Sequence, residues 1–282
     1  MHLGAWQLDT INGGRFRIDG GVLFGLVPKS LWGPIASPDA ENRVLCGNHC
    51  VLARDGRHTV LIDTGCGTKY DPLQRKFYAM EDGNPLLEDL AALGVTAEDI
   101  DTVVFSHLHF DHAGGATQLD GRGQLVPTFP KARYLANRLE WEDATAGGPE
   151  LQTAYSPNNL LPLAHSGRLV LVDGDAPLVP GLTACCTGGH TRGHMAVIFQ
   201  SAGQTAFFIG DLCPTTAHIR RMWCTAYDIY PLETRRRKPE LLDEAARQRW
   251  LVVWNHDPHV TAGYVAHHPN REFVVEEPRQ VL

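Results

Sequence analysis

A short stretch from Ser106 to Gly115 concentrates side chains that bind metal ions. It reads Ser-His-Leu-His-Phe-Asp-His-Ala-Gly-Gly, so three imidazoles and one carboxylate fall within six residues. Imidazole nitrogens and carboxylate oxygens are common ligands of zinc and related ions. Four such groups are too many for one ion that must also hold a water. The spacing therefore predicts two adjacent metals, with neighbouring residues turned to different ions.

The residues before this stretch predict the element that positions it. Ile100 to Phe105 is an apolar run that is typical of a buried strand. A rigid sheet can present metal ligands at its edge when a strand is followed by a ligand-rich turn and then by two glycines. Asp63 and Asp211 also follow apolar strand-like runs, at 58–62 and 205–209. Sites on sheets tend to lie at such strand ends, so these carboxylates are expected near the same edge.

Apolar alternation, capping residues and turn signals predict elements along the whole chain. Strands are expected as a pair within 14–27 around the turn 19–21, and at 50–53, 58–62, 100–105, 131–136, 183–187, 195–200, 205–209, 251–254, 264–267 and 272–275. Helices are expected at 85–93, 137–144 and 239–249. The two halves repeat the order of strands followed by a strand–helix unit, and no flexible linker separates them. We predict one domain over residues 1–282 with an α+β fold of four layers, a sandwich of the αββα type.

Three segments, 28–42, 69–82 and 146–166, do not fit this regular pattern. The first and third are rich in Gly, Pro, Ser or Asn and are expected to be loops, the first of them exposed. The second is polar with interleaved aromatic residues, and a surface segment is favoured over a substrate lid. Long loops are often functional, so whether these three cover the site is left open.

Composition limits the partners and the compartment. The 282 residues carry 25 basic and 32 acidic side chains, a net charge of −7, which disfavours nucleic acid as a partner. The basic run 235–238 is read as the solvated start of a helix. No apolar run approaches the ~20 residues of a membrane span. The N-terminus lacks the pattern of a signal peptide, and the seven cysteines suggest no disulfide framework, so a cytoplasmic protein is expected.

The order of the polar residues resembles the metallo-β-lactamase superfamily. The resemblance is strongest to its dinuclear hydrolases, such as acyl-homoserine-lactone lactonases and methyl parathion hydrolases, and it covers residues 14–268. It rests on His107-x-His109-x-Asp111-His112 followed by His194, Asp211 and His256. By position, it implies a first metal held by His107, His109 and His194, a second metal held by Asp111, His112 and His256, and a bridging Asp211.

Some of these assignments have competitors. His190 competes with His194, and the family pattern His-x-x-Gly-His is taken to favour His194. His256 competes with His259, His267 and His268, and is preferred because it follows the apolar strand 251–254. Asp63 is expected to orient a histidine ligand instead of binding metal.

The resemblance also implies a chemistry. A hydroxide bridging two divalent ions, most simply Zn²⁺ with Fe, Mn or Co as alternatives, would attack an ester, lactone or phosphotriester. Asp111 is the candidate for passing a proton to the leaving group. Asp211 stands where true β-lactamases have Cys or Ser, which disfavours β-lactams. The substrate is expected to be a small molecule, and a homodimer is left open.

One departure from the family pattern and one alternative function bear on this expectation. Lactonases of the family carry a Tyr three residues after the bridging Asp, but Pro214 stands here. Tyr227 or Tyr230 could replace that Tyr only if the fold brings one of them near. A di-iron redox protein or oxygenase on the same fold is the alternative function, because the ligand set also permits iron.

Overall fold

Two seven-stranded sheets form the centre of the computed structural model, which describes residues 1–146, 148–151 and 154–282. In spatial order the first sheet contains β1 (His2–Leu3), β2 (Trp6–Asn12), β5 (His49–Arg54), β6 (Thr59–Ile62), β7 (Thr102–Val104), β10 (Arg133–Asn137) and β11 (Leu169–Val172). The second contains β12 (Ala176–Val179), β13 (Leu182–Cys186), β14 (Met195–Ser201), β15 (Gln204–Phe208), β16 (Leu251–Val253), β17 (Ala262–His268) and β18 (Glu272–Arg279). Two small sheets pair β3 (Phe16–Asp19) with β4 (Arg43–Cys46), and β8 (Thr117–Leu119) with β9 (Leu125–Pro127).

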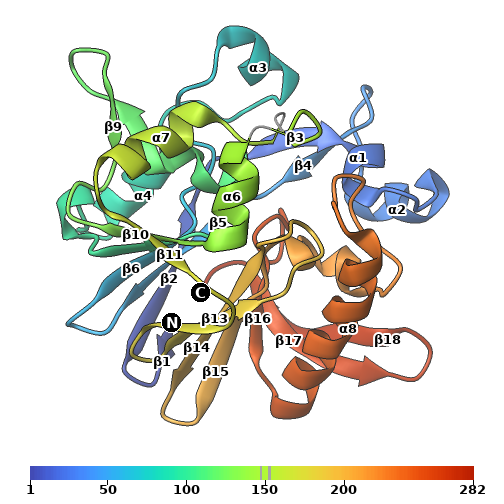
Figure 1. The fold of residues 1–282 in the computed structure, drawn as a ribbon. Helices are drawn as coiled ribbons and strands as arrows, with labels where there is room; N and C mark the ends of the chain where they lie inside the picture. The colour runs from blue at the N-terminus through green and yellow to red at the C-terminus, as the bar shows by residue number, and fades with distance from the viewer. Residues whose placement is uncertain (147, 152–153) are drawn as a thin grey trace.

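The helices lie outside or beside these sheets (Figure 1). They are α1 (Gly20–Phe24), α2 (Lys29–Ala36), α3 (Pro72–Phe77), α4 (Pro85–Ala92), α5 (Phe110–Ala113), α6 (Arg138–Ala146), α7 (Pro157–His165) and α8 (Pro231–Gln248). Short 3₁₀ turns are η1 (Ala97–Asp99), η2 (Gly114–Ala116), η3 (Gly210–Leu212) and η4 (Thr216–Ile219). Among the described residues, no helix combines the length and the apolar character that crossing a bilayer requires.

Both faces of each sheet are buried, which produces the four layers. In β5, Val51 and Ala53 point into the core between the two sheets, whereas Leu52 points to the opposite face. This alternation follows from the two-residue period of a strand. Leu86 and Leu90 of α4 cover the outer face of the first sheet.

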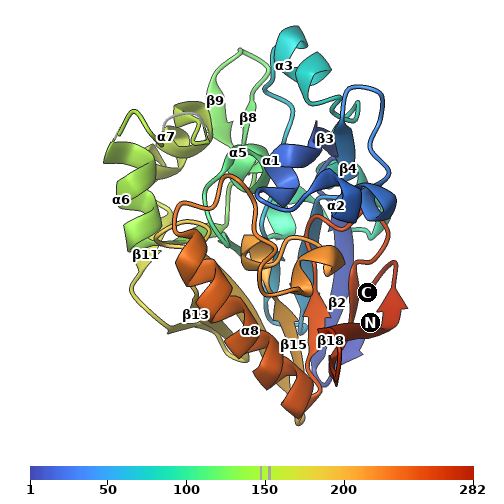
Figure 2. The same cartoon turned by 90° about the vertical axis from the view of Figure 1, so that its right-hand side faces the viewer.

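On the other side, Leu241 and Leu242 of α8 cover the outer face of the second sheet, across which this helix lies in Figure 2. The predicted α+β sandwich of the αββα type is confirmed.

The predicted strand pair within 14–27 is wrong in its second half. β3 is present, but the chain then turns into α1, because the side chain of Asp19 accepts hydrogen bonds from the backbone N–H groups of Gly21 and Val22. An Asp followed by two glycines thus serves as a helix N-cap instead of a hairpin turn. β3 pairs with the distant strand β4.

The segments 28–42 and 146–166 are more regular than predicted. α2 begins directly after Pro28, and its Trp32 is buried and stacks on Phe24 with ring centroids 5.0 Å apart, so the first segment is not an exposed loop. α7 occupies the end of the third segment, of which residues 147, 152 and 153 lie outside the described residues.

The last predicted helix begins earlier than expected. α8 starts at Pro231, so the basic run 235–238 lies inside it, with Pro239 accommodated in the helix. Lys238 is fully buried and donates a hydrogen bond to the backbone carbonyl of Trp223, so the reading of this run as a solvated end is wrong.

Parallel pairing brings the polar strand ends together. β6 pairs with β7 and β15 pairs with β16 in parallel, so the chain leaves each pair at one edge of its sheet. Asp63 follows β6, the histidine-rich stretch follows β7, Asp211 follows β15 and His256 follows β16. The sheets therefore place all four at one end of the sandwich, as predicted for sheet-based sites.

Candidate metal centre

Three side chains at this end of the sandwich form what we call the mixed group: Asp111, His112 and His256. All three are at least nine-tenths buried, and their ligand atoms lie within 4.8 Å of one another. Nε2 of His256 is 3.2 Å from Nε2 of His112 and 3.4 Å from Oδ2 of Asp111. The structure thus brings together the three residues predicted to hold the second metal.

A second set, the histidine group, comprises His107, His109 and His190. Their ligand atoms also lie within 4.8 Å of one another, and Nδ1 of His109 is 3.1 Å from Nε2 of His190. Nε2 of His107 is buried and has no hydrogen-bond partner among the described residues. A buried polar atom without a partner is rare in proteins, and this nitrogen is free to bind a metal ion.

Asp211 lies between the two groups. Its Oδ1 is 3.2 Å from Nε2 of His256 and 3.4 Å from Nε2 of His112, whereas its Oδ2 is 3.5 Å from Nε2 of His190. One carboxylate therefore presents one oxygen to each group. This is the arrangement that a bridging ligand between two ions requires.

The spacing of these donor atoms fits metal ions. Zinc bound tetrahedrally at about 2.0 Å from each ligand holds its ligand atoms about 3.3 Å apart. The contacts among Asp111, His112, Asp211 and His256 span 3.2–3.8 Å, close to that value. The chemistry of the donors, imidazoles with carboxylates, agrees with a zinc-like ion at each group.

The structure does not bring His194 into the histidine group, so our choice of His194 over His190 needs correction. Nε2 of His194 accepts a hydrogen bond from the backbone N–H of Asp211 at 3.0 Å, and its Nδ1 is 2.6 Å from Oγ1 of Thr187. Both ring nitrogens are therefore occupied. The loop after β13 turns at Gly188 and Gly189, which both have positive φ, and this turn points His190 towards His107 and His109.

His194 instead supports the backbone that carries Asp211. A Cβ on Gly210 would lie only 2.6 Å from Nε2 of His194, and Gly210 has a φ of +57°. Both facts require glycine at this position. The imidazole thus packs against the Gly210–Asp211 peptide and fixes where the Asp211 side chain begins.

Each imidazole in contact with Asp211 is oriented through its other nitrogen. Nδ1 of His112 donates to Oδ2 of Asp63, and Nδ1 of His190 donates to Oδ1 of Asp228, both at 2.8 Å. Nδ1 of His256 donates to the carbonyl of Gly47 at 2.9 Å. Such contacts fix the tautomer so that Nε2 is free for a ligand. Asp63 has the orienting position that the sequence analysis predicted.

We expect Asp63→Asn to weaken metal binding without unfolding the protein. Asn can still accept the hydrogen bond from the Ser106 N–H and tolerates the φ of +56° at this position, but it cannot act as a carboxylate acceptor for His112. Metal affinity measured against a competing chelator should fall by about ten- to a hundredfold. Asp101→Asn, which alters a carboxylate bonded to Thr59 at the far end of the sheet, is the control and should change nothing. Equal affinities for the two variants would refute this role.

Glu140 of α6 joins the separate parts of the histidine group. This buried carboxylate accepts hydrogen bonds from the backbone N–H of Leu108, the hydroxyl of Tyr155 and the hydroxyl of Thr191. Leu108 lies between His107 and His109, and Thr191 follows His190. Burial raises the pKa of Glu140, although these three hydrogen bonds counteract that rise.

The pKa values of the imidazoles in the two groups shift in both directions, and the direction does not follow the groups. In the histidine group itself, burial opposes protonation of His190, but Asp211 and Asp228 raise its pKa above the ordinary value. Burial lowers the pKa of His107 and of His109 well below the ordinary value, so both imidazoles are neutral and ready to act as ligands. For His112, burial opposes protonation, but the carboxylates of Asp111, Asp211 and Asp63 outweigh it and raise the pKa well above the ordinary value. The pKa of Asp211 is held well below its usual range, because the charges of His256, His112 and His190 outweigh its burial.

Aromatic residues surround the centre. The ring of Phe16 meets His256 edge-on with centroids 5.6 Å apart, and Tyr78 packs on Phe110 at 5.1 Å. The ring of Tyr155 lies 5.1 Å from that of His109. Segments 69–82 and 146–166 therefore contact the metal-binding stretch through Tyr78 and Tyr155.

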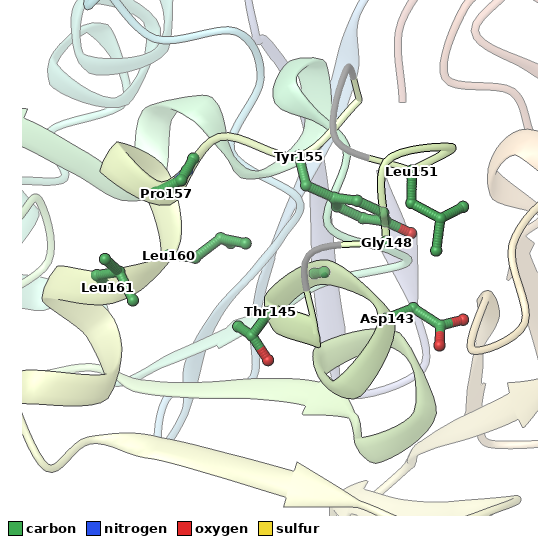
Figure 3. A pocket seen from close by; sticks show the side chains of 9 residues that line it. Asp143, Thr145, Gly148, Leu151, Tyr155, Pro157, Leu160 and Leu161 are labelled. Carbon is green, nitrogen blue, oxygen red and sulfur yellow. The ribbon is translucent and has the colours of Figure 1, made fainter.

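Two cavities share Tyr155. One, of about 400 Å³, lies between α6 and α7 and is lined largely by apolar side chains, among them Leu151, Leu160 and Leu161 (Figure 3). The other, of about 290 Å³, lies beside Phe110 and is lined mainly by polar side chains.

Tyr227 also reaches the centre. Its ring stands edge-on to that of His190, with centroids 5.3 Å apart. Burial, and next the charge of Asp211, raise the pKa of Tyr227 well above the ordinary value, so its hydroxyl stays protonated. Tyr230, the other candidate, is exposed at the start of α8.

Comparison with known proteins identifies the family. A model of the metallo-β-lactamase superfamily matches residues 43–256, a range that contains both groups and Asp211. The chain belongs to the metallo-β-lactamase superfamily. An N-acyl homoserine lactonase of Bacillus cereus is 25% identical over 162 residues, which are 54% of this chain and 58% of that protein. One from Bacillus sp. is 29% identical over 122 residues, 43% of this chain and 42% of that protein. The chain thus spans about half the length of these curated relatives.

Two solved structures resemble the whole chain. A probable metal-dependent hydrolase from Staphylococcus aureus has a TM-score of 0.89 and 30% identity, and the match covers 99% of this chain and 100% of that one. AidC, a dizinc quorum-quenching lactonase solved with a product, has a TM-score of 0.81 and covers 99% of this chain and 96% of its own. Its identity is only 19%, so this likeness shows the fold alone.

Several residues that contact the proposed ligands or their neighbours in the chain carry no recognisable signal in the sequence. Asp228 lies in the irregular segment before α8, and no strand or motif marked it. Glu140 looked like an ordinary helix residue. Asn255, whose side-chain amide donates to Oδ1 of Asp211 at 2.6 Å, was recognisable only as the neighbour of His256.

Proposed function

We propose that this member of the superfamily is a metal-dependent hydrolase that uses two divalent ions, most simply Zn²⁺, to cleave an ester, lactone or phosphotriester of a small molecule. The observation that carries the proposal is Asp211, whose two oxygens face the two groups. His107, His109 and His190 would hold one ion, and Asp111, His112 and His256 the other. When bound, such ions supply a water nucleophile at neutral pH and Lewis-acid assistance to the substrate oxygen.

The protein's own residues would handle the proton and the substrate. Asp111 is the proposed carrier of the proton to the leaving group, because its Oδ2 lies at the edge of the mixed group and its side chain keeps some access to solvent. Tyr227 is the proposed hydrogen-bond donor to the substrate oxygen, since its protonated hydroxyl belongs to a ring beside His190. Tyr227 would then replace the tyrosine that lactonases of the family carry at the position of Pro214.

We expect Asp111→Asn to slow the reaction most where the leaving group is poor. An alkoxide expelled from a lactone needs a proton, whereas 4-nitrophenolate leaves without one, so kcat should fall by about a hundredfold for the lactone and much less for the nitrophenyl ester. Metal content measured on the same preparation separates loss of a ligand from loss of proton transfer. An equal fall for both substrates with full metal content would remove Asp111 from this role.

A substrate panel tests the proposed function. The metal-reconstituted protein should hydrolyse at least one class among N-acyl homoserine lactones, simple lactones, thioesters and phosphotriesters, with β-lactams as the class expected to fail. The Bacillus relatives are named N-acyl homoserine lactonases, which supports testing lactones first. Nothing in the matches reported above favours the di-iron redox alternative, and a colourless zinc-loaded enzyme with hydrolytic activity would exclude it. Inactivity towards every class would refute the hydrolase proposal.

A further inference from the structure

The polar cavity of about 290 Å³ adjoins the proposed centre. Phe110, which lies between His109 and Asp111 in the chain, forms part of its wall, and so does Tyr155, whose ring packs on His109. The cavity therefore borders the histidine-rich stretch through these two aromatic residues. No acidic residue occurs among the described residues that line it, although the chain carries a net charge of −7.

Lys69 brings a positive charge to this cavity. Its Nζ donates hydrogen bonds to the backbone carbonyls of Gly114 and Thr117, which leaves one of its three N–H donors for another partner. Within the described part of the chain, the hydrogen-bond partners of this ammonium group are these two carbonyls, and no carboxylate is among them. Burial lowers the pKa of Lys69 to about 8, so burial disfavours the charged ammonium and a bound anion would favour it.

The N-terminus of α7 adds a second positive feature. Residues 156–159, which contain the N-cap Ser156 and the first turn of the helix, line the same cavity. No side chain caps this end, so the positive end of the helix dipole is not neutralised there. The ammonium group and the helix end come from different parts of the chain and meet at one cavity.

We propose that this cavity is a subsite for an anionic group, a carboxylate or a phosphate, carried by the substrate at the end away from the bond that is cleaved. The inference rests on the proposed hydrolase function and specifies that the substrate carries a negative charge. The neighbouring cavity between α6 and α7 lacks this character, since leucines and one carboxylate, that of Asp143, line it (Figure 3). An anion bound beside Lys69 would favour the charged ammonium that burial disfavours.

Matched substrates test the subsite. Three 4-nitrophenyl esters of equal chain length are compared with the metal-loaded enzyme: a neutral pentanoate, the half-ester of glutaric acid, and an analogue ending in a phosphonate. We expect kcat/KM for one or both anionic esters to exceed that for the neutral ester by about tenfold, mainly through KM, as a charge-assisted hydrogen bond implies. The carboxylate and phosphonate arms decide between the two anions.

Variants of Lys69 and Gln74 distinguish recognition of the anionic ester from a purely structural role of Lys69. Lys69→Met should remove the preference for the anionic ester, and Lys69→Arg should keep part of it. Gln74→Glu should reduce it by placing a negative charge in the cavity wall, while the capping box with Asp71 is retained. If Lys69 only supports the turn at Gly114, Lys69→Met will slow all three esters equally, and that result would overturn the proposal.

A binding measurement keeps the two proposals distinguishable. Calorimetric titration of the metal-loaded protein with glutarate should show binding that Lys69→Met weakens by about tenfold. Such binding without hydrolysis of any ester would support the subsite and contradict the hydrolase function. The opposite result would be hydrolysis with no preference for the anionic esters, together with glutarate binding that Lys69→Met does not change. That result would support the hydrolase function and reject the subsite.

Discussion

Asp211→Ala is expected to abolish the binding of both ions and to lower kcat/KM by at least about a thousandfold. Charge stabilisation by bound metals contributes several kcal/mol to such reactions, and each 1.36 kcal/mol is a factor of ten in rate. The reason lies in the position of this carboxylate, with Oδ1 within 3.4 Å of His112 and His256 and Oδ2 3.5 Å from His190. Without it, the two groups lose both a shared ligand and the charge that screens one cation from the other.

Metal analysis and kinetics on the same preparations check this result. Asp211→Asn is the sharper variant, because it keeps the size of the side chain and can still accept the hydrogen bond from Asn255 while losing the charge. Asp101→Asn provides the matched control at the opposite end of the sheet. Retention of two ions and of most of the activity by Asp211→Asn would mean that Asp211 does not bridge the groups.

His190→Ala and His194→Ala should have opposite outcomes, although the sequence analysis preferred His194. We expect His190→Ala to lose about one equivalent of metal and to slow the reaction by at least about a hundredfold, because it removes a ligand from the histidine group. His194→Ala should retain both equivalents. It should instead lower the free energy of unfolding by about 1–3 kcal/mol, because the buried N–H of Asp211 loses its acceptor.

Substitution by glutamine distinguishes a residue that supports the backbone from one that binds metal. His194→Gln retains an acceptor that can reach the Asp211 N–H, so it should recover much of the stability that His194→Ala loses. His190→Gln should not recover the lost metal. If His194→Ala proved to be the variant that loses an equivalent of metal, the assignment taken from the structure would be wrong and the original preference would stand.

Much of the architecture could be predicted because it depends on local periodicity. The alternation in β5 and β6 and the apolar runs before the histidine-rich stretch, Asp211 and His256 all reflect burial on sheets, and burial is visible in residue type. The helix α4, with Asn84 as its N-cap, Pro85 at its start and Leu86 and Leu90 on its buried side, was likewise predictable. The prediction of elements failed where one local sequence pattern is compatible with two structures. At Asp19, for example, Asp-Gly-Gly caps a helix instead of closing a hairpin.

By itself, the sequence predicted a metal site at the ends of buried strands. His107, His109, Asp111 and His112 are close together in the chain, and no fold could separate them widely. Only the tertiary structure favours His190 over His194 as a ligand. Both follow the same strand, and the choice depends on how Gly188 and Gly189 turn the chain and on which imidazole the Asp211 N–H occupies. The partners Asp228, Glu140 and Lys69 were also beyond prediction, because their roles arise from contacts between residues that are distant in the sequence and share no local pattern.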